Sequence, residues 1–409
     1  MPFHMMIKPG GALCNMRCAY CFFLSKAETL GSRKRLAPDL LEAFIRQYIE
    51  SQPDGPVVFT WQGGEPTLLG LDFFEMVVRL QQKHCPPGKS ICNDLQTNGQ
   101  LVDGAWCDFL KEYNWLVGLS IDGPQDLHDL YRSRNDGQGS FKAALHAAHL
   151  LGEHKIPFNT LTVLHHQNAK EPLRVYKFLR DEVGSVCMQF LPLVETVGHA
   201  HTAPAFWDVS RMPQIGSPEA MPGTPQSFVE PWCVEPLDYG RFMTTLFDYW
   251  KNHDMGRIIL PFFDCMLSIW LGRPASMCVF GNVCGNQLAL DSDGSIYFCD
   301  RFCYADYRLG KLDATQPGSL AAIAENSEVA WFGKMKGAVP KECRQCRWAF
   351  ACKGECPKNR FLLSESGGLG LNYLCAGLKH IFAHIDGDME RMKNDYLSLQ
   401  PRNIHESHE

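Results

Sequence analysis

The chain has 409 residues, enough for two or three domains, since a domain usually holds about 100 to 200 residues. Hydrophobic residues make up 45% and charged residues 21%, and the formal net charge is −6, a balance typical of a globular protein without a basic nucleic-acid-binding surface. No run reaches the ~18 apolar residues of a membrane span, and the first ten residues lack the apolar core of a signal peptide. We therefore expect a cytoplasmic protein with neither nucleic acid nor a membrane as its partner.

The first ~190 residues alternate between β-rich and amphipathic segments, which predicts repeated β-then-α units. The predicted strands are Met5–Lys8, Val57–Trp61, Ile91–Thr97, Leu116–Ile121, Phe158–Leu164 and Val186–Leu191. The predicted helices are Pro38–Ser51, Leu71–Lys83, Gly104–Tyr113, Phe141–His154 and Glu171–Asp181. Such units predict a parallel α/β sheet, open or curled toward a barrel, with its ligand site in the loops at the carboxyl ends of the strands.

The regular pattern breaks at residues 195–236, where prolines interrupt any helix. We interpret this stretch as an insertion, most simply a flexible surface segment that is partly ordered by Phe206, Trp207 and Trp232. Its place near the expected barrel mouth suggests contact with substrate. Beyond it, helices are predicted at Leu237–Trp250, Phe262–Leu271 and Ala376–Leu397, followed by about a dozen polar residues that we expect to fray.

Three cysteines follow the first predicted strand with the spacing Cys-x3-Cys-x2-Cys: Cys14, Cys18 and Cys21. Three thiolates at this spacing can surround one cubane iron–sulfur cluster and leave its fourth iron without a protein ligand. Zinc is the alternative, but structural zinc prefers four ligands, and the nearest further donor, His4, is on the wrong side of the strand. The spacing therefore favours a cluster with one open iron.

The motif, with Tyr20 before its last cysteine, resembles the signature of the radical S-adenosylmethionine (SAM) superfamily. In that family the open iron binds the amino and carboxylate groups of SAM, whose cleavage releases a 5′-deoxyadenosyl radical. The resemblance implies a partial (β/α)6 barrel, similar to a TIM barrel. It also implies a set of SAM-binding residues, namely Tyr20, Gly64, Glu65, Ser120, Arg132 and Val194.

The resemblance gives each of these residues a role. Gly64 and Glu65 would provide backbone access and a carboxylate for the SAM ammonium, and Ser120 would hydrogen-bond the ribose. Arg132 would bind the SAM carboxylate, and Val194 would contact the adenosine. Each residue alone is compatible with a turn, a helix cap, a surface charge or plain core, but their order and their positions at strand ends favour the joint interpretation.

Eight more cysteines follow in the C-terminal part: Cys278, Cys284, Cys299, Cys343, Cys346, Cys352, Cys356 and Cys375. Their spacing resembles the SPASM domain, a small loop-rich extension with auxiliary clusters on radical SAM enzymes that modify peptides and proteins. The resemblance implies interleaved pairing, in which one [4Fe–4S] cluster is held by Cys278, Cys284, Cys299 and Cys356, and a second by Cys343, Cys346, Cys352 and Cys375. The expected cofactors are then three [4Fe–4S] clusters and SAM. Two structural zinc sites remain the alternative that spacing leaves open.

Eleven proposed ligands leave seven cysteines: Cys85, Cys92, Cys107, Cys187, Cys233, Cys265 and Cys303. Most of them occur in an apolar context and are expected to be small core residues. The place of Cys233 in the proline-rich insertion is compatible with an exposed thiol.

From Ile7 to about His380 the chain resembles the anaerobic sulfatase-maturating enzymes. These enzymes oxidise one cysteine or serine of an unfolded sulfatase to Cα-formylglycine. Supporting stretches are Gln62–Thr67, Leu95–Gly99, Gly118–Pro124 and Asp293–Asp300. The resemblance implies an unfolded sulfatase polypeptide as substrate and a low-potential electron donor, a ferredoxin or flavodoxin, as partner.

Asp300 matches the proton acceptor of that family. Removing a hydrogen atom from the substrate Cβ makes the adjacent S–H or O–H far more acidic. A weak base with a reference pKa near ~3.9 therefore suffices. The alternative is a turn or capping residue after a strand.

We expect a barrel at 1–235 that includes most of the 195–236 insertion, a helical bridge at 237–275, a SPASM domain at 276–380, and a C-terminal helix and tail at 381–409. One alternative is a SPASM enzyme that forms thioether or carbon–carbon crosslinks in a ribosomal peptide. Such enzymes often carry an N-terminal recognition domain, for which the position of Cys14 is not expected to leave room. Another is an iron–sulfur electron carrier or zinc-binding module, which would not need the three-cysteine site.

Overall fold

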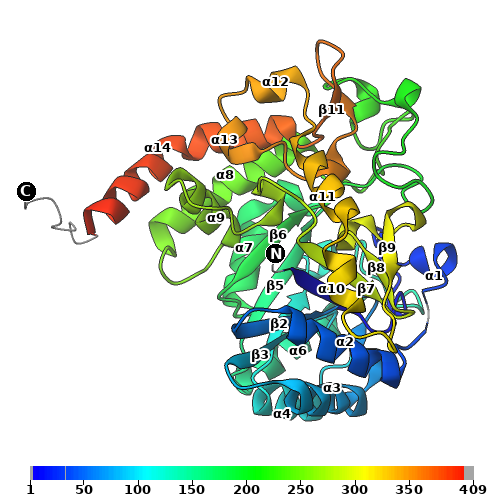
Figure 1. Cartoon of the computed structure of the whole chain (residues 1–409). Helices are drawn as coiled ribbons and strands as arrows, with labels where there is room; N and C mark the ends of the chain where they lie inside the picture. The colour runs from blue at the N-terminus through cyan, green and yellow to red at the C-terminus, as the bar shows by residue number, and fades with distance from the viewer. Residues whose placement is uncertain (1–2, 33, 400–409) are drawn as a thin grey trace, which may run out of the picture.

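The computed structural model describes residues 3–32 and 34–399 and is built on a mostly parallel nine-stranded sheet (Figure 1). The strand order is β6-β5-β4-β3-β2-β1-β7-β8-β9. Strands β1 to β6 and β7 are parallel, whereas β8 and β9 are antiparallel additions at the edge. The bounds are β1 His4–Lys8, β2 Gly55–Trp61, β3 Lys89–Thr97, β4 Leu116–Ser120, β5 Phe158–Leu164, β6 Met188–Pro192, β7 Gln287–Asp291, β8 Ser295–Tyr297 and β9 Arg308–Lys311. The predicted α/β class is confirmed.

Helices alternate with the first six strands. They are α1 Lys26–Thr29, α2 Pro38–Ser51, α3 Leu71–His84, α4 Gly104–Glu112, α5 Gln125–His128, α6 Phe141–Glu153 and α7 Pro172–Asp181. Amphipathic segments predicted all of them except the short α1 and α5. Local signals set their starts. Pro38 occupies the first turn of α2, and the Asp103 carboxylate accepts a hydrogen bond from the Trp106 N–H at the start of α4.

The C-terminal part consists of short helices around the cysteines and three longer ones. Its elements are α8 Pro236–His253, α9 Pro261–Trp270, α10 Ser319–Ala324, α11 Ser327–Lys334, α12 Lys341–Arg344, α13 Ala349–Cys352, α14 Cys375–Leu399, β10 Leu362–Leu363 and β11 Leu369–Leu371. Helices α8 and α14 pack very closely, because a Cβ at Gly377 would lie 1.9 Å from the Pro236 carbonyl oxygen. Helix α14 continues across residue 380, and the frayed tail predicted after it lies almost entirely outside the described residues.

Strand β7 joins the C-terminal part to the barrel sheet. It pairs with β1 along its whole length, with Lys8 opposite Asp291. The sequence predicted six strands and missed this extension, because pairing between segments so far apart leaves no local pattern. The extension places the loop after β8 beside the carboxyl end of β1.

Residues 195–236 are packed against the C-terminal part, so the prediction of a flexible surface segment is wrong. Trp207 and Trp232 are buried. The Tyr304 and Tyr307 hydroxyls each donate a hydrogen bond of 2.6 Å, to the carbonyl oxygens of His199 and Pro204 respectively. These remote hydroxyls satisfy backbone groups that a proline-rich segment cannot pair within itself.

Cys233 is also fully buried, in contrast to the exposed thiol that its place in the insertion allowed. Its sulfur accepts a hydrogen bond from the Glu195 N–H and donates one to the Glu195 carbonyl oxygen. Of the other six spare cysteines, Cys107, Cys265 and Cys303 are buried as predicted, Cys85 and Cys187 are half-buried, and Cys92 is exposed.

Across residues 3–32 and 34–399, no helix combines the length and the apolar character that crossing a membrane would require.

Candidate functional site

A cavity of about 280 Å³ lies at the carboxyl ends of the barrel strands. This is the place where βα loops of parallel sheets bind ligands. Of the residues predicted to contact SAM, Ser120, Arg132 and Val194 line it, together with Cys21. Tyr20, Gly64 and Glu65 do not line this cavity.

The loop after β1 carries Cys14, Cys18 and Cys21, all half-buried. Burial raises the pKa of the Cys14 and Cys18 thiols to about 12. These thiols therefore lose their protons, and become the thiolates that bind iron, only when a metal or another cation lies nearby. The Met16 N–H points at the Cys14 sulfur at 3.4 Å, and the Asn98 amide reaches the same sulfur at 3.8 Å.

Gly64 clamps the loop after β2 onto the cysteine loop. Its N–H donates to the Gly11 carbonyl oxygen at 2.7 Å, and the next N–H, of Glu65, donates to the Leu13 carbonyl oxygen at 2.7 Å. A Cβ at Gly64 would lie 1.9 Å from that Leu13 oxygen. Gly64 thus allows a close backbone approach to the cysteine loop, and its backbone access to SAM stays a prediction.

The Glu65 carboxylate is occupied by four protein hydrogen bonds. It accepts from the Thr67 N–H at 3.1 Å, the Thr67 hydroxyl at 2.6 Å, the Thr97 hydroxyl at 2.8 Å and the Asn98 N–H at 2.7 Å. Glu65 is buried and ties the loops after β2 and β3 together. Its contact with the SAM ammonium stays a prediction.

Asp122 holds two of the predicted SAM residues in place. It is fully buried and accepts hydrogen bonds from Arg132 Nε at 2.7 Å, Arg132 Nη2 at 3.1 Å and the Tyr20 hydroxyl at 2.5 Å. Burial alone would raise the pKa of Asp122, but the Arg132 guanidinium outweighs it and lowers that pKa. Asp122 was included in the stretch Gly118–Pro124, but the sequence predicted no role for it. Its position directly after a strand could have indicated a site residue.

His128 supports the same network in its neutral form. Its Nδ1 accepts a hydrogen bond from the Asp122 N–H at 3.2 Å, and its Nε2 lies 2.9 Å from the Ser140 hydroxyl. Burial lowers the pKa of His128 from 6.5 to about 4. Below pH 6.5 the unfolded chain therefore binds a proton that the folded chain does not.

This difference predicts that the free energy of unfolding falls as the pH drops from 6.5 toward 4. His128 contributes up to about 1.4 kcal/mol of this fall per pH unit. His128→Gln keeps a donor and an acceptor but removes the titration. The gap in unfolding free energy between the native protein and the variant should therefore shrink between pH 7.5 and pH 5. Anaerobic urea unfolding at both pH values measures it, and a gap that stays constant would contradict the prediction.

Asp300 comes from the C-terminal part and meets Lys8 at the end of β1. Lys8 Nζ forms an ion pair with Asp300 Oδ1 and lies 4.1 Å from the centre of the Phe23 ring. Burial alone would lower the pKa of Lys8, but the Asp300 carboxylate outweighs it, and the pKa is raised. Lys8 is therefore a buried cation. Lys8 was not identified as a site residue from the sequence, although a lysine at the end of an apolar strand could have indicated one.

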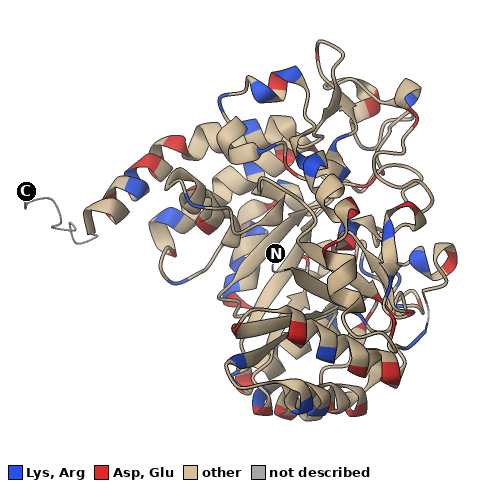
Figure 2. Cartoon of the chain, viewed as in Figure 1, with Lys and Arg blue, Asp and Glu red and all other residues tan. Residues whose placement is uncertain are grey.

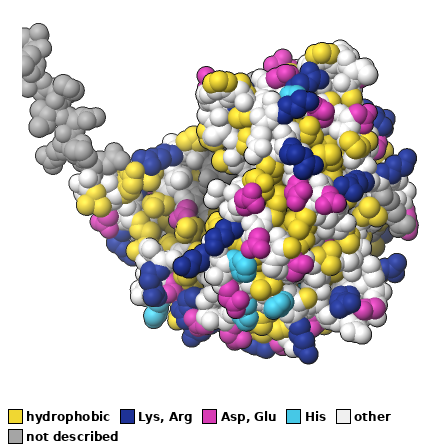
Figure 3. All heavy atoms as spheres, turned by 90° about the horizontal axis from the view of Figure 1, so that it is seen from below, with side chains coloured by type: hydrophobic (Ala, Val, Ile, Leu, Met, Phe, Trp, Pro, Cys, Tyr) yellow, Lys and Arg dark blue, Asp and Glu magenta, His cyan; other side chains and the backbone are white. Residues whose placement is uncertain are grey.

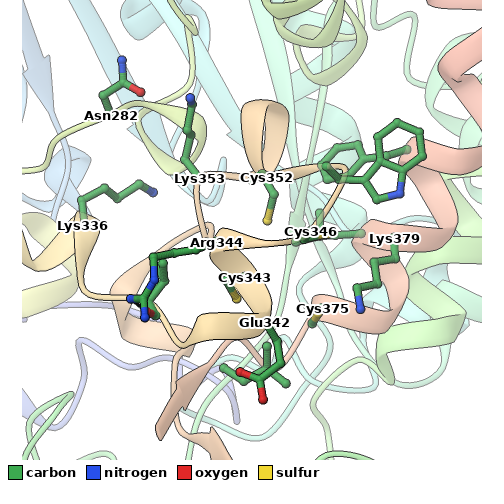
Figure 4. Close-up of a pocket in the computed structure, with 18 residues that line it drawn as sticks. Asn282, Lys336, Glu342, Cys343, Arg344, Cys346, Cys352, Lys353, Cys375 and Lys379 are labelled. Carbon is green, nitrogen blue, oxygen red and sulfur yellow. Dashed lines mark hydrogen bonds between the residues drawn. The ribbon is translucent and has the colours of Figure 1, made fainter. Parts of the chain in front are cut away.

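Asp300 also lines a second cavity, of about 80 Å³, behind the first. Four cysteines surround this second cavity: Cys278, Cys284, Cys299 and Cys356. A third cavity, of about 310 Å³, is surrounded by Cys343, Cys346, Cys352 and Cys375 (Figure 4). The structure thus gathers the eight cysteines into the same two groups as the interleaved pairing.

The cysteine groups suit clusters better than single ions. Within the described residues, no three His, Cys, Asp or Glu side chains are close enough to share one metal ion. A cubane cluster keeps its thiolates farther apart than one ion does, because irons and sulfides lie between them. The residues present therefore fit iron–sulfur clusters, and preformed zinc sites are not seen in the described part of the chain.

Two family models match the chain: the Radical SAM superfamily at residues 10–179 and an iron–sulfur cluster-binding domain, SPASM, at 278–347. A serine-type anaerobic sulfatase-maturating enzyme of Bacteroides thetaiotaomicron is 37% identical over 98% of this chain and 94% of its own length. A cysteine-type enzyme of Clostridium perfringens is 32% identical, over 94% and 96% respectively.

Solved structures agree with these relatives. The chain superposes on native anSMEcpe with bound AdoMet at a TM-score of 0.80, with 31% identity, covering 96% of this chain and all of the other. A complex of the same protein with AdoMet and a peptide named Kp18Cys gives a TM-score of 0.81, with 31% identity, covering 97% of this chain and all of the other.

Proposed function

The chain belongs to the family of anaerobic sulfatase-maturating enzymes, and from this premise we propose that it oxidises one cysteine or serine of a sulfatase polypeptide to Cα-formylglycine. The family confirms the predicted cofactors, SAM and iron–sulfur clusters. The observation that carries the proposal is the position of Asp300, which lines both the barrel cavity and the cysteine-lined cavity behind it. A proton acceptor at this place serves an oxidation that releases a proton and an electron together.

Different residues would hold the iron–sulfur cluster and SAM. Cys14, Cys18 and Cys21 would hold a cluster with one open iron, and Ser120 and Arg132 would face SAM across the barrel cavity. When bound, the cluster and SAM supply a 5′-deoxyadenosyl radical, which removes a hydrogen atom from the substrate Cβ. Glu65 and Asp122 keep the surrounding loops in place through their hydrogen bonds.

Asp300 would accept the proton of the substrate thiol or hydroxyl once that hydrogen atom has left. Lys8 is charged and buried beside Asp300. Its ion pair fixes the carboxylate in position and keeps a positive charge next to it during the reaction. The substrate loses one hydrogen atom, one proton and one electron, and SAM becomes methionine and 5′-deoxyadenosine. Water then replaces sulfur when the substrate is cysteine.

The insertion also reaches this cavity. Glu195, its first residue, lines the cavity, and its carboxylate lies 2.5 Å from Lys358 Nζ. Both side chains are buried, and the pair ties the insertion to the C-terminal part at the edge of the cavity. A contact of the insertion with substrate is supported by this placement.

Two further partners belong to the proposal. A low-potential ferredoxin or flavodoxin would supply the electron that starts each turnover, since cleavage of SAM needs one electron. A sulfatase chain still unfolded around its target residue would reach the cavity, and the cytoplasmic location expected from the sequence suits such a substrate.

The test is the mass of a peptide bearing a Cys-x-Pro-x-Arg segment after anaerobic incubation with the reduced, cluster-loaded enzyme and SAM. We expect the cysteine to become an aldehyde and the same peptide with alanine at that position to stay unchanged. A serine version of the peptide tests the second substrate. An unchanged cysteine peptide with 5′-deoxyadenosine still released would reject sulfatase maturation and favour the crosslinking alternative.

A further inference from the structure

The three cavities form a row that leads from the barrel to the surface. The barrel cavity shares Asp300 and Arg301 with the second cavity, and the second shares Lys336 with the third. Exposed residues, among them Arg344 and Lys379, line the third cavity. The third cavity therefore opens toward solvent at the end of the row.

The surface around the third cavity is strongly basic in a chain that is acidic overall. Residues 334–360 contain eight Lys and Arg against two Glu, and five of these bases are partly or fully exposed, whereas the whole chain has a net charge of −6. We call the partly or fully exposed bases that line the third cavity, or that directly adjoin a lining residue in the chain, the basic rim: Lys341, Arg344, Arg347, Lys353 and Lys379. Helix α12, at the top of the molecule, contributes two of them (Figure 2).

The two Glu side chains of this segment hydrogen-bond to neutral donors and, in the described part of the chain, form no ion pair with the basic rim. The Glu342 carboxylate accepts hydrogen bonds from the Ser364 and Ser366 hydroxyls. Glu355 is buried and accepts from the Asn359 and Asn372 amides. Among the described residues, Arg347 is the one member of the basic rim that forms an ion pair with an acidic side chain, Asp386 at 3.3 Å.

The basic rim is not needed to balance charge inside the domain. Two buried cations already sit among the cysteine sites. Lys336 donates to the Val279 and Glu355 carbonyl oxygens, and Arg360 donates to the Gly354 carbonyl oxygen at 2.8 Å, among others. Exposed charges contribute little to folding stability, so a concentration of them at a cavity mouth points to an outside partner.

We propose that the basic rim docks a small acidic protein that carries single electrons. This inference rests on the proposed function, because that oxidation requires an electron to leave the substrate. The balance is one to one: the substrate radical loses one electron and gives its proton to Asp300, and the oxidised carrier gains one electron. Opposite charges bring such partners together quickly and in a weak, salt-sensitive complex.

The probe is oxidised flavodoxin, an acidic one-electron carrier, titrated against the cluster-loaded enzyme at low and at physiological salt. We expect binding that weakens steeply with salt. The double variant Arg344→Glu/Lys379→Glu should bind at least about 10-fold more weakly, which corresponds to about 1.4 kcal/mol. The matched control is Lys111→Glu/Lys142→Glu, on exposed positions of α4 and α6, which changes the net charge equally and should bind within about twofold of the native protein.

The control face differs in character from the basic rim. Helix α4 lies at the other end of the molecule from α12 (Figure 1). On the face seen from below, basic and acidic side chains are interspersed (Figure 3). Equal losses in both variants, or binding that ignores salt, would overturn the docking proposal.

Iron content and dithionite-driven turnover of the cysteine peptide are measured on the same samples. If the native enzyme makes no aldehyde with dithionite, the proposed function fails, while the binding data still decide the docking surface. If the rim variant loses iron, carbodiimide crosslinking of the native enzyme decides instead. Crosslinks from Lys341 or Lys379 to flavodoxin carboxylates support docking at the basic rim, and crosslinks confined to other lysines overturn it.

Discussion

Asp300→Asn is expected to lower aldehyde formation by at least about 100-fold while cleavage of SAM continues, since a positioned proton acceptor contributes about 10² to 10⁴-fold. Asparagine keeps the size of the side chain but cannot take the substrate proton. Without that step the substrate radical keeps its S–H or O–H bond and is a much weaker reductant. The measurement compares aldehyde and 5′-deoxyadenosine formed from the cysteine peptide in the same anaerobic sample.

The control for this variant is Asp306→Asn, at an exposed carboxylate six residues further along, which should leave both products unchanged. Asp300→Glu restores a carboxylate one methylene farther from its backbone and should recover part of the aldehyde yield. Equal loss of aldehyde and 5′-deoxyadenosine in Asp300→Asn, with iron content intact, would mean that the residue supports SAM binding rather than proton transfer.

The position of Asp300 follows from the sheet. Strand β7 pairs with β1 in parallel, with Lys8 opposite Asp291. The chain then turns back through β8 and arrives at Asp300 beside the Lys8 ammonium. The barrel supplies the cation and the C-terminal part supplies the carboxylate, so the proton acceptor is in place only when the two parts are joined through this sheet.

Local sequence patterns predicted the first six strands and helices α2, α3, α4, α6 and α7 within three residues. Phe158–Leu164 and Pro38–Ser51 match β5 and α2 end for end, because alternation and helical spacing report which faces are buried. The addition of β7 and the ordering of residues 195–236 depend on distant partners. The carbonyl oxygens of His199 and Pro204 are satisfied by tyrosines more than 100 residues away, and no local signal encodes such pairs.

The site divides in the same way. Cysteine spacing indicates clusters because ligands must lie on one short loop or a few of them, and the family resemblance supplied the pairing. Glu65 and Asp122 are different, since their neighbours decide their roles. The Glu65 carboxylate accepts four protein hydrogen bonds and so joins two loops. The motif that contains Glu65 does not reveal those donors.

The pairing of the eight auxiliary cysteines predicts a distinctive pattern of iron loss. Cys299 and Cys356 lie on one cavity and Cys352 on the other. Cys299→Ala/Cys356→Ala should therefore lower iron by one cluster, about four atoms per chain, whereas Cys299→Ala/Cys352→Ala should lower it by two clusters, about eight. Both doubles remove two thiols, so the comparison isolates which thiols share a cluster.

Iron and sulfide analysis after anaerobic reconstitution measures the loss. The matched control, Cys85→Ala/Cys187→Ala, removes two half-buried thiols outside the three cavities and should lose no iron. If neighbouring cysteines in the sequence paired instead, Cys299 would share a cluster with Cys343 and not with Cys356. Cys299→Ala/Cys356→Ala would then lose two clusters, and the interleaved pairing would be wrong. The interleaved pattern requires residues 343–375 to fold over the loop after β8, the same closure that sets Asp300 between the barrel cavity and its neighbour.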